Sequence, residues 1–290
     1  MNKTDSNPLV PAGNAMERIR MMQPSFSKSH KKIADFILQN YEKAVFLTSF
    51  KMGQQCGVSE SSIIRFATTL GYSGYSEFQR EIQDLLKTQI TMSQRLKETS
   101  LSGDGGIMQG MMQKGIDGIQ YAMMNLNEKD FDRAVAVLSQ AKRVFLVGSR
   151  SSYGLVYYFA FVLNWIRESV FAVNCSNEII DYLATLTEDD AVLAISLPKY
   201  PKSTVDALEA ARSKGAHTIA ITDTMTSPLI PHSEISLLVY TELLSYSDNI
   251  APVMCLITAL LTAIGAADPQ KTAGLLEKHE ALWEESGIYA

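Results

Sequence analysis

Residues 57–78 read GVSESSIIRFATTLGYSGYSEF, a segment with clear signals for the beginning and end of a helix. Gly57 can end one helix by adopting a left-handed conformation. Ser59 is a good N-cap for the next helix, because its hydroxyl can accept a backbone N–H of the first turn. That helix is expected to run to Leu70, where Gly71 supplies the stop.

The sequence before Gly57 predicts two more helices of the same unit. Thr48 or Ser49 can cap a short helix that stops at Cys56, and Ser29 could cap an earlier helix. The apolar residues that share one face of the earlier helix are Ile33, Phe36 and Ile37. A short helix, a turn and a second helix have the proportions of a helix-turn-helix.

The second helix of such a motif enters the major groove of DNA, so its exposed side chains matter most. Ser61 and Ser62 would lie in its first turn, where base edges are met. Arg65 follows one turn later on the same face and could reach a guanine edge or a phosphate. Alternatively, the two serines only cap the helix and Arg65 is a solvated surface charge; spacing alone leaves both open. The residues expected to pack inward are Val58, Ile63 and Phe66 (or Ile64).

The second half of the chain alternates between apolar runs and helical stretches. The five runs lie at residues 144–147, 170–173, 191–195, 218–221 and 235–239. Apolar strands separated by helices predict a parallel sheet covered on both faces. Ligands of such sheets bind beyond the carboxyl ends of the strands. Residues 148–152 (GSRSS) follow the first run and could bind an anion at a helix N-terminus; a plain tight turn is the alternative.

Residues 58–82 (VSESSIIRFATTLGYSGYSEFQREI) resemble the pattern VS-x-x-[ST]-I-x-RF-x-x-x-LG[FY]-x-G[FY]-x-EF of the RpiR family of bacterial transcription regulators. The matching positions are Val58, Ser59, Ser62, Ile63, Arg65, Phe66, Leu70, Gly71, Tyr72, Gly74, Tyr75, Glu77 and Phe78. The resemblance implies a winged or extended helix-turn-helix followed by a SIS domain, a sugar-isomerase-type fold that senses phosphosugars. One departure is Gly53, where the family usually has Ala; glycine costs the helix about 1 kcal/mol.

The resemblance also implies where a ligand would bind. SIS domains hold a sugar phosphate on a G-x-G-x-S loop, which this chain matches at Gly148 and Ser152, with Arg150 in place of the second glycine. The SIS pattern S-x-S-G-x-T keeps only Ser196 of its hydroxyls, and residues 196–201 (SLPKYP) look like a family branch with an S-F-P-[RK]-Y loop. Lys199 there could bind a phosphate or carboxylate, or the loop is simply a rigid proline turn. Thr222 and Asp223, followed by Ser227 and Pro228, match the family motif ITD-x-x-x-SPL, which supports the pocket rim in the family.

Composition and charge limit the class of protein. With 290 residues, 46% of them hydrophobic, the chain is long enough for two domains with real cores and is not a wholly disordered protein. Residues 1–90 hold 11 Lys and Arg against 8 Asp and Glu, whereas residues 91–290 hold 15 against 23. A polyanion would therefore meet the first part, although so small an excess can arise by chance.

Other features argue against several functions. The 3 cysteines lie far apart and the four histidines have no metal-ligand spacing, so no disulfide framework, metal or cofactor is expected. The first fifteen residues hold no apolar run, so no secretory signal is expected. Residues 249–267 carry no charge, but Pro252, Thr258, Thr262 and Gly265 interrupt them, which favours a buried helix over a membrane span. Residues 188–190 (EDD) are expected to form a solvated turn.

Together these observations predict an all-α helix-turn-helix domain (residues 16–90) and an α/β SIS domain with a five-stranded parallel sheet flanked by helices (residues 113–270). A tail (1–15), a linker (91–112) and a C-terminal helical tail (271–290) complete the chain. The expected DNA-contacting residues are Lys51, Ser59, Ser61, Ser62, Arg65 and Tyr72. The expected ligand-binding residues are Gly148, Ser149, Arg150, Ser151, Ser152, Ser196, Lys199, Tyr200, Thr222 and Asp223.

The predicted function is a cytoplasmic, homodimeric or homotetrameric regulator that binds double-stranded operator DNA and a small anionic metabolite, either a sugar phosphate or a sugar acid. Repression of carbohydrate or related metabolism is the mode that the resemblance implies. No membrane partner is expected. Two alternatives stay open: a SIS-fold sugar-phosphate isomerase with an accessory helical domain, and a ligand-gated protein-interaction module that binds no DNA.

Overall fold

The computed structural model describes residues 14–86, 92–93, 96, 106–175, 179–241 and 246–289. Its residues fall into two compact units, one within Met1–Gln113 and Glu242–Asp248 and the other within Lys114–Thr241 and Asn249–Ala290. Most of the expected tail and linker lies outside the described residues. At their edges the structure is helical: Asn14 caps a helix that begins at Ala15, and another helix begins at Ile107, inside the range expected to be a linker.

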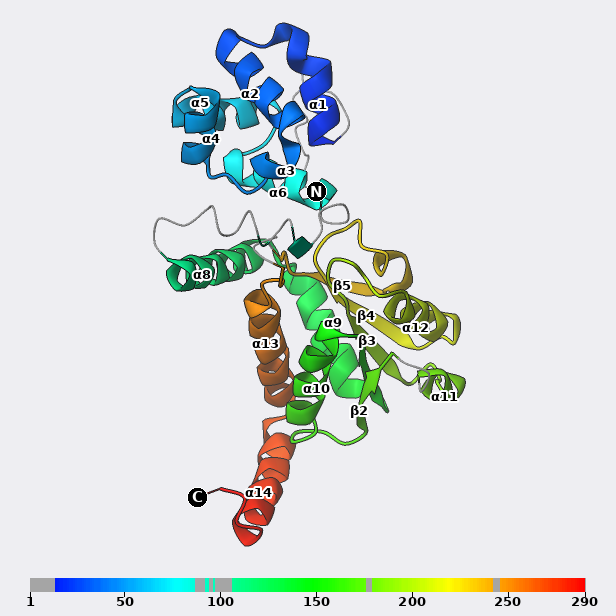
Figure 1. The fold of residues 1–290 in the computed structure, drawn as a ribbon. Helices are drawn as coiled ribbons and strands as arrows, with labels where there is room; N and C mark the ends of the chain where they lie inside the picture. Colours follow the sequence, from blue (N-terminus) through cyan, green and yellow to red (C-terminus); the bar gives the residue numbers. More distant parts are fainter. Residues whose placement is uncertain are drawn as a thin grey trace. The chain divides into compact units, whose positions relative to one another are not determined.

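The first unit is built from helices (Figure 1). In chain order they are α1 (Ala15–Met22), the short 3-10 helix η1 (Gln23–Ser25), α2 (Lys28–Gln39), α3 (Tyr41–Ala44), α4 (Ser49–Cys56), α5 (Glu60–Thr69) and α6 (Tyr75–Leu86). The α4–turn–α5 pair confirms the predicted helix-turn-helix. Its boundaries follow from local chemistry, as the sequence indicates.

Four capping residues set those boundaries. Thr48 accepts the backbone N–H of Lys51 and starts α4, and Ser59 accepts the backbone N–H of Ser62 and starts α5. Gly57 adopts a left-handed conformation with φ 61° and ends α4. The prediction for α2 was wrong by two residues, because Ser27 rather than Ser29 caps it. Both serines can cap, and only the packed structure distinguishes them.

Phe66 is the centre of the first unit's core. Its side chain is 1% exposed, and its ring makes edge contacts with Phe26, His30 and Phe78 at centroid distances of 5.3, 5.4 and 5.9 Å. Such aromatic pairs add about 0.5–1.5 kcal/mol each beyond the apolar area that they bury. Phe66 therefore ties α5 to α2 and α6. Ile64, the alternative inward residue, is 43% exposed.

Gly53 has a packing role that the sequence did not reveal. A Cβ atom at this position would lie 2.9 Å from the Val58 carbonyl oxygen and 3.4 Å from the Glu60 backbone nitrogen. The absence of a side chain thus lets α4 approach the start of α5 closely. Glycine lowers the intrinsic stability of α4 but makes this tight turn possible.

The second unit contains the parallel sheet, with strand order β2-β1-β3-β4-β5. The strands are β1 (Val144–Gly148), β2 (Val170–Asn174), β3 (Ala191–Ile195), β4 (His217–Thr222) and β5 (Ile235–Leu238). The other elements are α8 (Ile107–Asn125), α9 (Glu128–Gln140), α10 (Ser151–Leu163), α11 (Ile179–Ala184), α12 (Lys202–Ser213), the 3-10 helix η2 (Ile230–His232), α13 (Ala251–Ala267) and α14 (Pro269–Glu285). All strand pairs are parallel, and the strand order reverses between β1 and β3.

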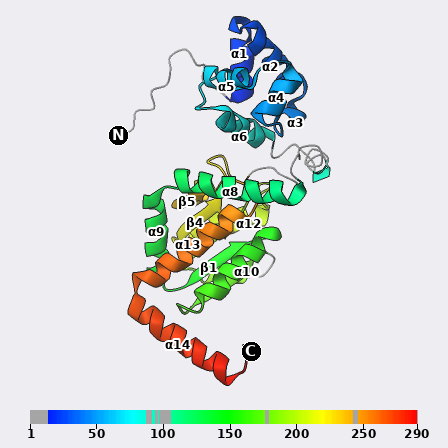
Figure 2. The same ribbon diagram turned by 90° about the vertical axis from the view of Figure 1, so that its left-hand side faces the viewer.

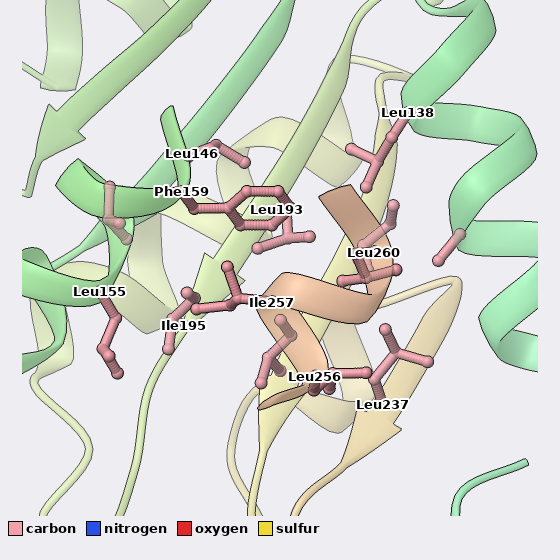
Figure 3. Packing of buried hydrophobic residues seen from close by; sticks show 14 of the residues in the cluster. Leu138, Leu146, Leu155, Phe159, Leu193, Ile195, Leu237, Leu256, Ile257 and Leu260 are labelled. Carbon is pink, nitrogen blue, oxygen red and sulfur yellow. The ribbon is translucent and has the colours of Figure 1, made fainter. Parts of the chain in front are cut away.

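Alternate residues of each strand face two different helical layers. Val144 and Leu146 of β1 pack toward α9, α10 and α13, whereas Phe145 and Val147 pack toward α11 and α12. Figures 1 and 2 show these two groups of helices on opposite faces of the sheet. Burial on both faces explains why the strand sequences are continuously apolar. In Figure 3, side chains of α10, α13 and the strands meet in the larger of the two cores.

Most of the uncharged stretch at residues 249–267 forms α13, which packs one face into the core as predicted and leaves Cys255, Thr258, Ala259 and Thr262 exposed on the other face. Its residues Val253, Ile257 and Leu260 are 0% exposed and belong to the main core. Among the described residues, no single helix is long and apolar enough to cross a membrane. Only α13 and α14 taken together reach that length and composition, and they are bent by 109°.

Asp190 corrects the expectation of a solvated turn at residues 188–190. Its side chain is 0% exposed and accepts hydrogen bonds from Nε and Nη2 of Arg143 at 2.8 and 2.6 Å, and from the backbone N–H of Thr187 at 2.8 Å. Burial alone would raise the pKa of Asp190, but these hydrogen bonds and the Arg143 charge hold it below its usual value. The carboxylate thus joins the segments that directly precede β1 and β3, at the amino ends of these strands.

Candidate functional site

The outer face of α5 presents the side chains expected to contact DNA. Ser61 and Arg65 are exposed, as predicted, and Ile64 lies exposed between them in sequence. Ser62 faces inward and is 9% exposed, and the Arg65 guanidinium lies 3.5 Å from its hydroxyl. The exposed face of α5 therefore combines a hydroxyl, an apolar side chain and one cation.

A surface hollow of about 540 Å³ lies beside this face. It is lined by Ser27, Ser29, His30, Ser62, Arg65, Thr68 and Thr69. The lining comes from the first turns of α2 and from α5, and it contains hydroxyls, a guanidinium and an imidazole. No sequence motif marks His30, because its contacts depend on the packing of α2 against α5.

Two other predicted DNA contacts have structural roles. Tyr72 is 6% exposed, its ring lies against Phe78, and the Arg18 guanidinium covers it at 5.2 Å from the ring centroid. The prediction that Tyr72 contacts DNA was therefore wrong, because the side chain belongs to the core. Ser59 stays exposed, but its hydroxyl is occupied as the α5 cap and lies 2.9 Å from those of Ser61 and Ser62. Lys51 on α4 is half-buried.

The second candidate site lies at the carboxyl ends of the strands. The parallel register pairs Val147 with Ala194 and Ile195 with Ile221, so the residues that follow β1, β3 and β4 reach the same edge of the sheet. The reversal of strand order between β1 and β3 lies at this edge, where ligands of such sheets bind. His232, the last residue of η2, lies before β5 and so at the amino ends of the strands, away from this edge.

Gly148 lets β1 and α10 approach closely. A Cβ atom there would lie 2.9 Å from Val156 and 3.2 Å from the Ile195 carbonyl oxygen. The loop that follows directs Ser149 inward, where its hydroxyl lies 3.0 Å from that of Ser203 and 2.9 Å from that of Thr204. Ser149 thus joins this loop to α12.

Two buried hydroxyls at this edge have no partner among the described residues. They belong to Ser196, which follows β3 and is 0% exposed, and to Thr241, which follows β5 and is 1% exposed. An unsatisfied buried hydroxyl costs about 1–3 kcal/mol, so such groups call for a reason. Ser196 was predicted as a site residue. Thr241 was not, because no motif marks it.

Two cations occupy strained positions at the same edge. Arg150 has φ 55° and ψ −127°, and Lys199 has φ 75°, conformations that favour glycine. Both side chains are exposed. The exposed Ser151 begins α10, and Ser152 is 6% exposed. Strain of this kind concentrates at functional sites.

The remaining predicted ligand residues, Tyr200, Thr222 and Asp223, form hydrogen bonds between the loops that follow β3 and β4. The Tyr200 hydroxyl donates a 2.5 Å hydrogen bond to Oδ1 of Asp223. Thr222 is 0% exposed, and its hydroxyl donates to the Ser196 carbonyl oxygen at 2.9 Å and lies 2.8 Å from the Ser227 hydroxyl. Thr222 thus links the β3 and β4 loops, and its predicted contact with ligand stays a prediction. Among the described residues, no three His, Cys, Asp or Glu side chains are arranged to hold a metal ion.

Comparison with known proteins agrees with both units. Residues 13–89 match the family described as helix-turn-helix domain, rpiR family, and residues 137–266 match the SIS domain. An uncharacterized HTH-type transcriptional regulator of Caldanaerobacter subterraneus is 30% identical over 235 residues, covering 77% of this chain and 79% of that protein. One of Haemophilus influenzae is 29% identical over 232 residues, covering 78% and 80%.

Solved structures share the fold. The Vibrio vulnificus NanR protein, complexed with ManNAc-6P, has a TM-score of 0.58 at 20% identity and covers 94% of this chain and 98% of its own. The sugar isomerase domain of an RpiR transcription factor from Sphaerobacter thermophilus has a TM-score of 0.57 at 21% identity, covering 59% and 97%. The chain therefore belongs to the RpiR family of HTH-type transcriptional regulators, with a helix-turn-helix domain followed by a SIS domain.

Proposed function

We propose that this regulator binds operator DNA through α5 and a small anionic metabolite, a sugar phosphate or a sugar acid, at the carboxyl edge of the sheet. The observation that carries the DNA-binding proposal is the exposed face of α5, where Ser61, Ile64 and Arg65 stand on a helix that is capped and packed from behind by Phe66. A rigid helix with a free face is the element that a major groove accepts.

The anionic ligand is inferred from three features of the SIS domain. Arg150 and Lys199 bring positive charge to the carboxyl edge on strained loops, and the buried Ser196 hydroxyl has no partner within the described part of the chain. A phosphate or carboxylate would accept hydrogen bonds from these groups, and charge-assisted bonds are the strong ones. The NanR structure with ManNAc-6P shows that a protein of this fold is compatible with a sugar phosphate ligand.

Two copies of the chain would act together, because a helix-turn-helix usually reads two half-sites about 34–36 Å apart, one turn of DNA. Ligand binding would change how the two DNA-binding domains are held and so release the operator. We expect the protein to repress genes for carbohydrate or related metabolism, because repression is the mode that the resemblance to the RpiR family implies. A coupling free energy of about 1–3 kcal/mol is enough for such a response. For this action on DNA, we expect the protein to lie in the cytoplasm.

The DNA part is tested by selecting duplexes from a random-sequence library with the full-length protein. Enrichment of a common sequence is expected, and Arg65→Ala should weaken binding to it. The matched control is Arg212→Ala, which removes an exposed arginine of the SIS domain. If no sequence is enriched, or if both variants bind as tightly as wild type, the α5 face is not a DNA reader.

The ligand part is tested by thermal unfolding with a panel of sugar phosphates and sugar acids. A ligand at about 100 times its dissociation constant adds about 2.7 kcal/mol of stability. Lys199→Gln should lose most of this stabilisation, whereas Lys214→Gln, at the C-terminal end of α12, should keep it. A panel without effect on wild type would contradict the proposal, and turnover of a hexose or pentose phosphate would replace it with the isomerase alternative.

A further inference from the structure

The hollow between α2 and α5 contains positive and hydrogen-bonding groups without a carboxylate. Its seven lining residues are Arg65, His30 and five residues that carry hydroxyls, namely Ser27, Ser29, Ser62, Thr68 and Thr69. A site with an arginine, an imidazole and several hydroxyls suits a phosphate group, which accepts many hydrogen bonds and carries negative charge. It lies next to the α5 face described above, where a DNA backbone would pass.

The position of His30 in this hollow is set by packing. Its ring makes edge contacts with Phe26 and Phe66, at centroid distances of 5.9 and 5.4 Å, and is half-buried. Arg65 comes from the facing helix and reaches back toward Ser62, with Nη2 3.5 Å from the hydroxyl. Two basic side chains from different helices are therefore held on one concave surface before any ligand arrives.

The charge state of His30 depends on what fills the hollow. Burial, and then the Arg65 charge, lower the pKa of His30 below its usual value, so the ring is mostly neutral near pH 7. The charged group that faces His30 from α5 is Arg65, and the neighbouring Phe26 and Phe66 are uncharged. On α2, the helix that carries His30, the nearby charged residues are Lys28, Lys31 and Lys32. A phosphate between the two side chains would favour the imidazolium form and raise this pKa.

We propose that this hollow binds a phosphate of the DNA backbone, held jointly by Arg65 and His30, and that His30 takes up a proton from solvent as the complex forms. The inference rests on the proposed DNA binding. In this proposal Arg65 contributes to the affinity for DNA and to the position of the protein along the duplex, and it does not read the bases. Sequence discrimination is then left to the exposed Ser61 and Ile64.

The test uses the full chain and a duplex selected by it, with affinity measured at constant ionic strength between about pH 5 and 8. Wild-type affinity should rise as pH falls, by up to about tenfold per unit, since one proton is taken up. His30→Gln should bind with no such pH dependence. His30→Lys, a permanent cation, should bind at least as tightly as wild type at pH 8 and also lose the dependence. The matched control His279→Gln, which removes a histidine of α14, should keep the wild-type profile.

Arg65→Ala supplies a second readout. As a phosphate contact, it should weaken selected and scrambled duplexes by the same factor and reduce the slope of log affinity against log salt by about 1. A His30→Gln profile equal to wild type, or a loss confined to the selected duplex in Arg65→Ala, would overturn the inference while leaving DNA binding intact. If the protein binds no duplex at any pH, both the proposed DNA binding and this phosphate site are wrong. If millimolar inorganic phosphate displaces duplexes of every length equally well, the hollow is a site for a free anion and not for the DNA backbone.

Discussion

Replacing Arg150 by glycine should raise stability and lower ligand affinity at the same time. The backbone at this position has φ 55° and ψ −127°, and the side chain is exposed at the start of α10. A residue with a Cβ atom held at such angles costs about 1–3 kcal/mol, which glycine does not incur. The same cation is a proposed ligand contact, so the substitution removes a charge-assisted hydrogen bond.

The net effect on stability can be worked out by comparing Arg150→Gly with Arg150→Ala. Both remove the cation from a helix N-terminus, where positive charge is unfavourable by about 0.3–1 kcal/mol, so this contribution cancels between them. Relative to alanine, glycine stabilises the folded state by about 1–3 kcal/mol because it removes the backbone strain. Glycine also destabilises it by about 0.5–1 kcal/mol, because the unfolded chain gains flexibility. Arg150→Gly should be more stable than Arg150→Ala by about 1 kcal/mol, or roughly 2–4 °C in melting temperature.

Urea denaturation and calorimetry of both variants measure this difference, and titration with the sugar phosphate or sugar acid that stabilises wild type measures affinity. Both variants should bind that ligand at least tenfold more weakly, which corresponds to about 1.4 kcal/mol. If Arg150→Gly is less stable than Arg150→Ala, the loop is not strained as its angles indicate. Unchanged affinity in both variants would remove Arg150 from the ligand site.

Three further predictions concern the folding of the two domains. Asp190→Asn should cost about 1.5–3 kcal/mol near pH 7, because it removes the charge-assisted hydrogen bonds between the buried carboxylate and Arg143, whose partly exposed guanidinium keeps its bond to the Thr185 carbonyl. Because the pKa of Asp190 is lowered, its contribution is present above about pH 4 and is lost as pH falls further, so the urea midpoints of variant and wild type should converge in acid. Gly53→Ala should destabilise the helix-turn-helix by about 1–2 kcal/mol, since the overlap with Val58 outweighs the better helix propensity, and a higher melting temperature would contradict the close packing. Phe66→Ala should cost about 3–5 kcal/mol in denaturant titrations, and a loss below 1 kcal/mol would show that its aromatic cluster is not the core of the domain.

Features that depend on neighbouring residues in the sequence were predicted well. Thr48, Gly57 and Ser59 mark the helix-turn-helix because capping uses backbone groups within three or four residues. The five apolar runs became the five strands, with small changes at their ends, because a strand buried on both faces has to be apolar throughout. The buried nature of α13 followed from the same reasoning.

Errors arose where distant segments determine a residue's surroundings. Tyr72 fits a family motif, yet its ring packs on Phe78 under Arg18, and no local pattern distinguishes a motif residue in the core from one on the surface. Asp190 looks like part of an acidic turn until Arg143, which precedes β1, is placed against it. Both depend on contacts between residues far apart in the chain.

The sequence by itself determined the fold class, the helix-turn-helix and the loops at which a ligand would be sought, because periodicity, caps and motifs act over short stretches of chain. Only the tertiary structure decided which of those residues are free to bind. It buried Thr222, left the hydroxyls of Ser196 and Thr241 without a partner among the residues that the structure describes, and placed His30 beside Arg65. The physical reason is that burial and hydrogen-bond satisfaction depend on every segment packed around a side chain.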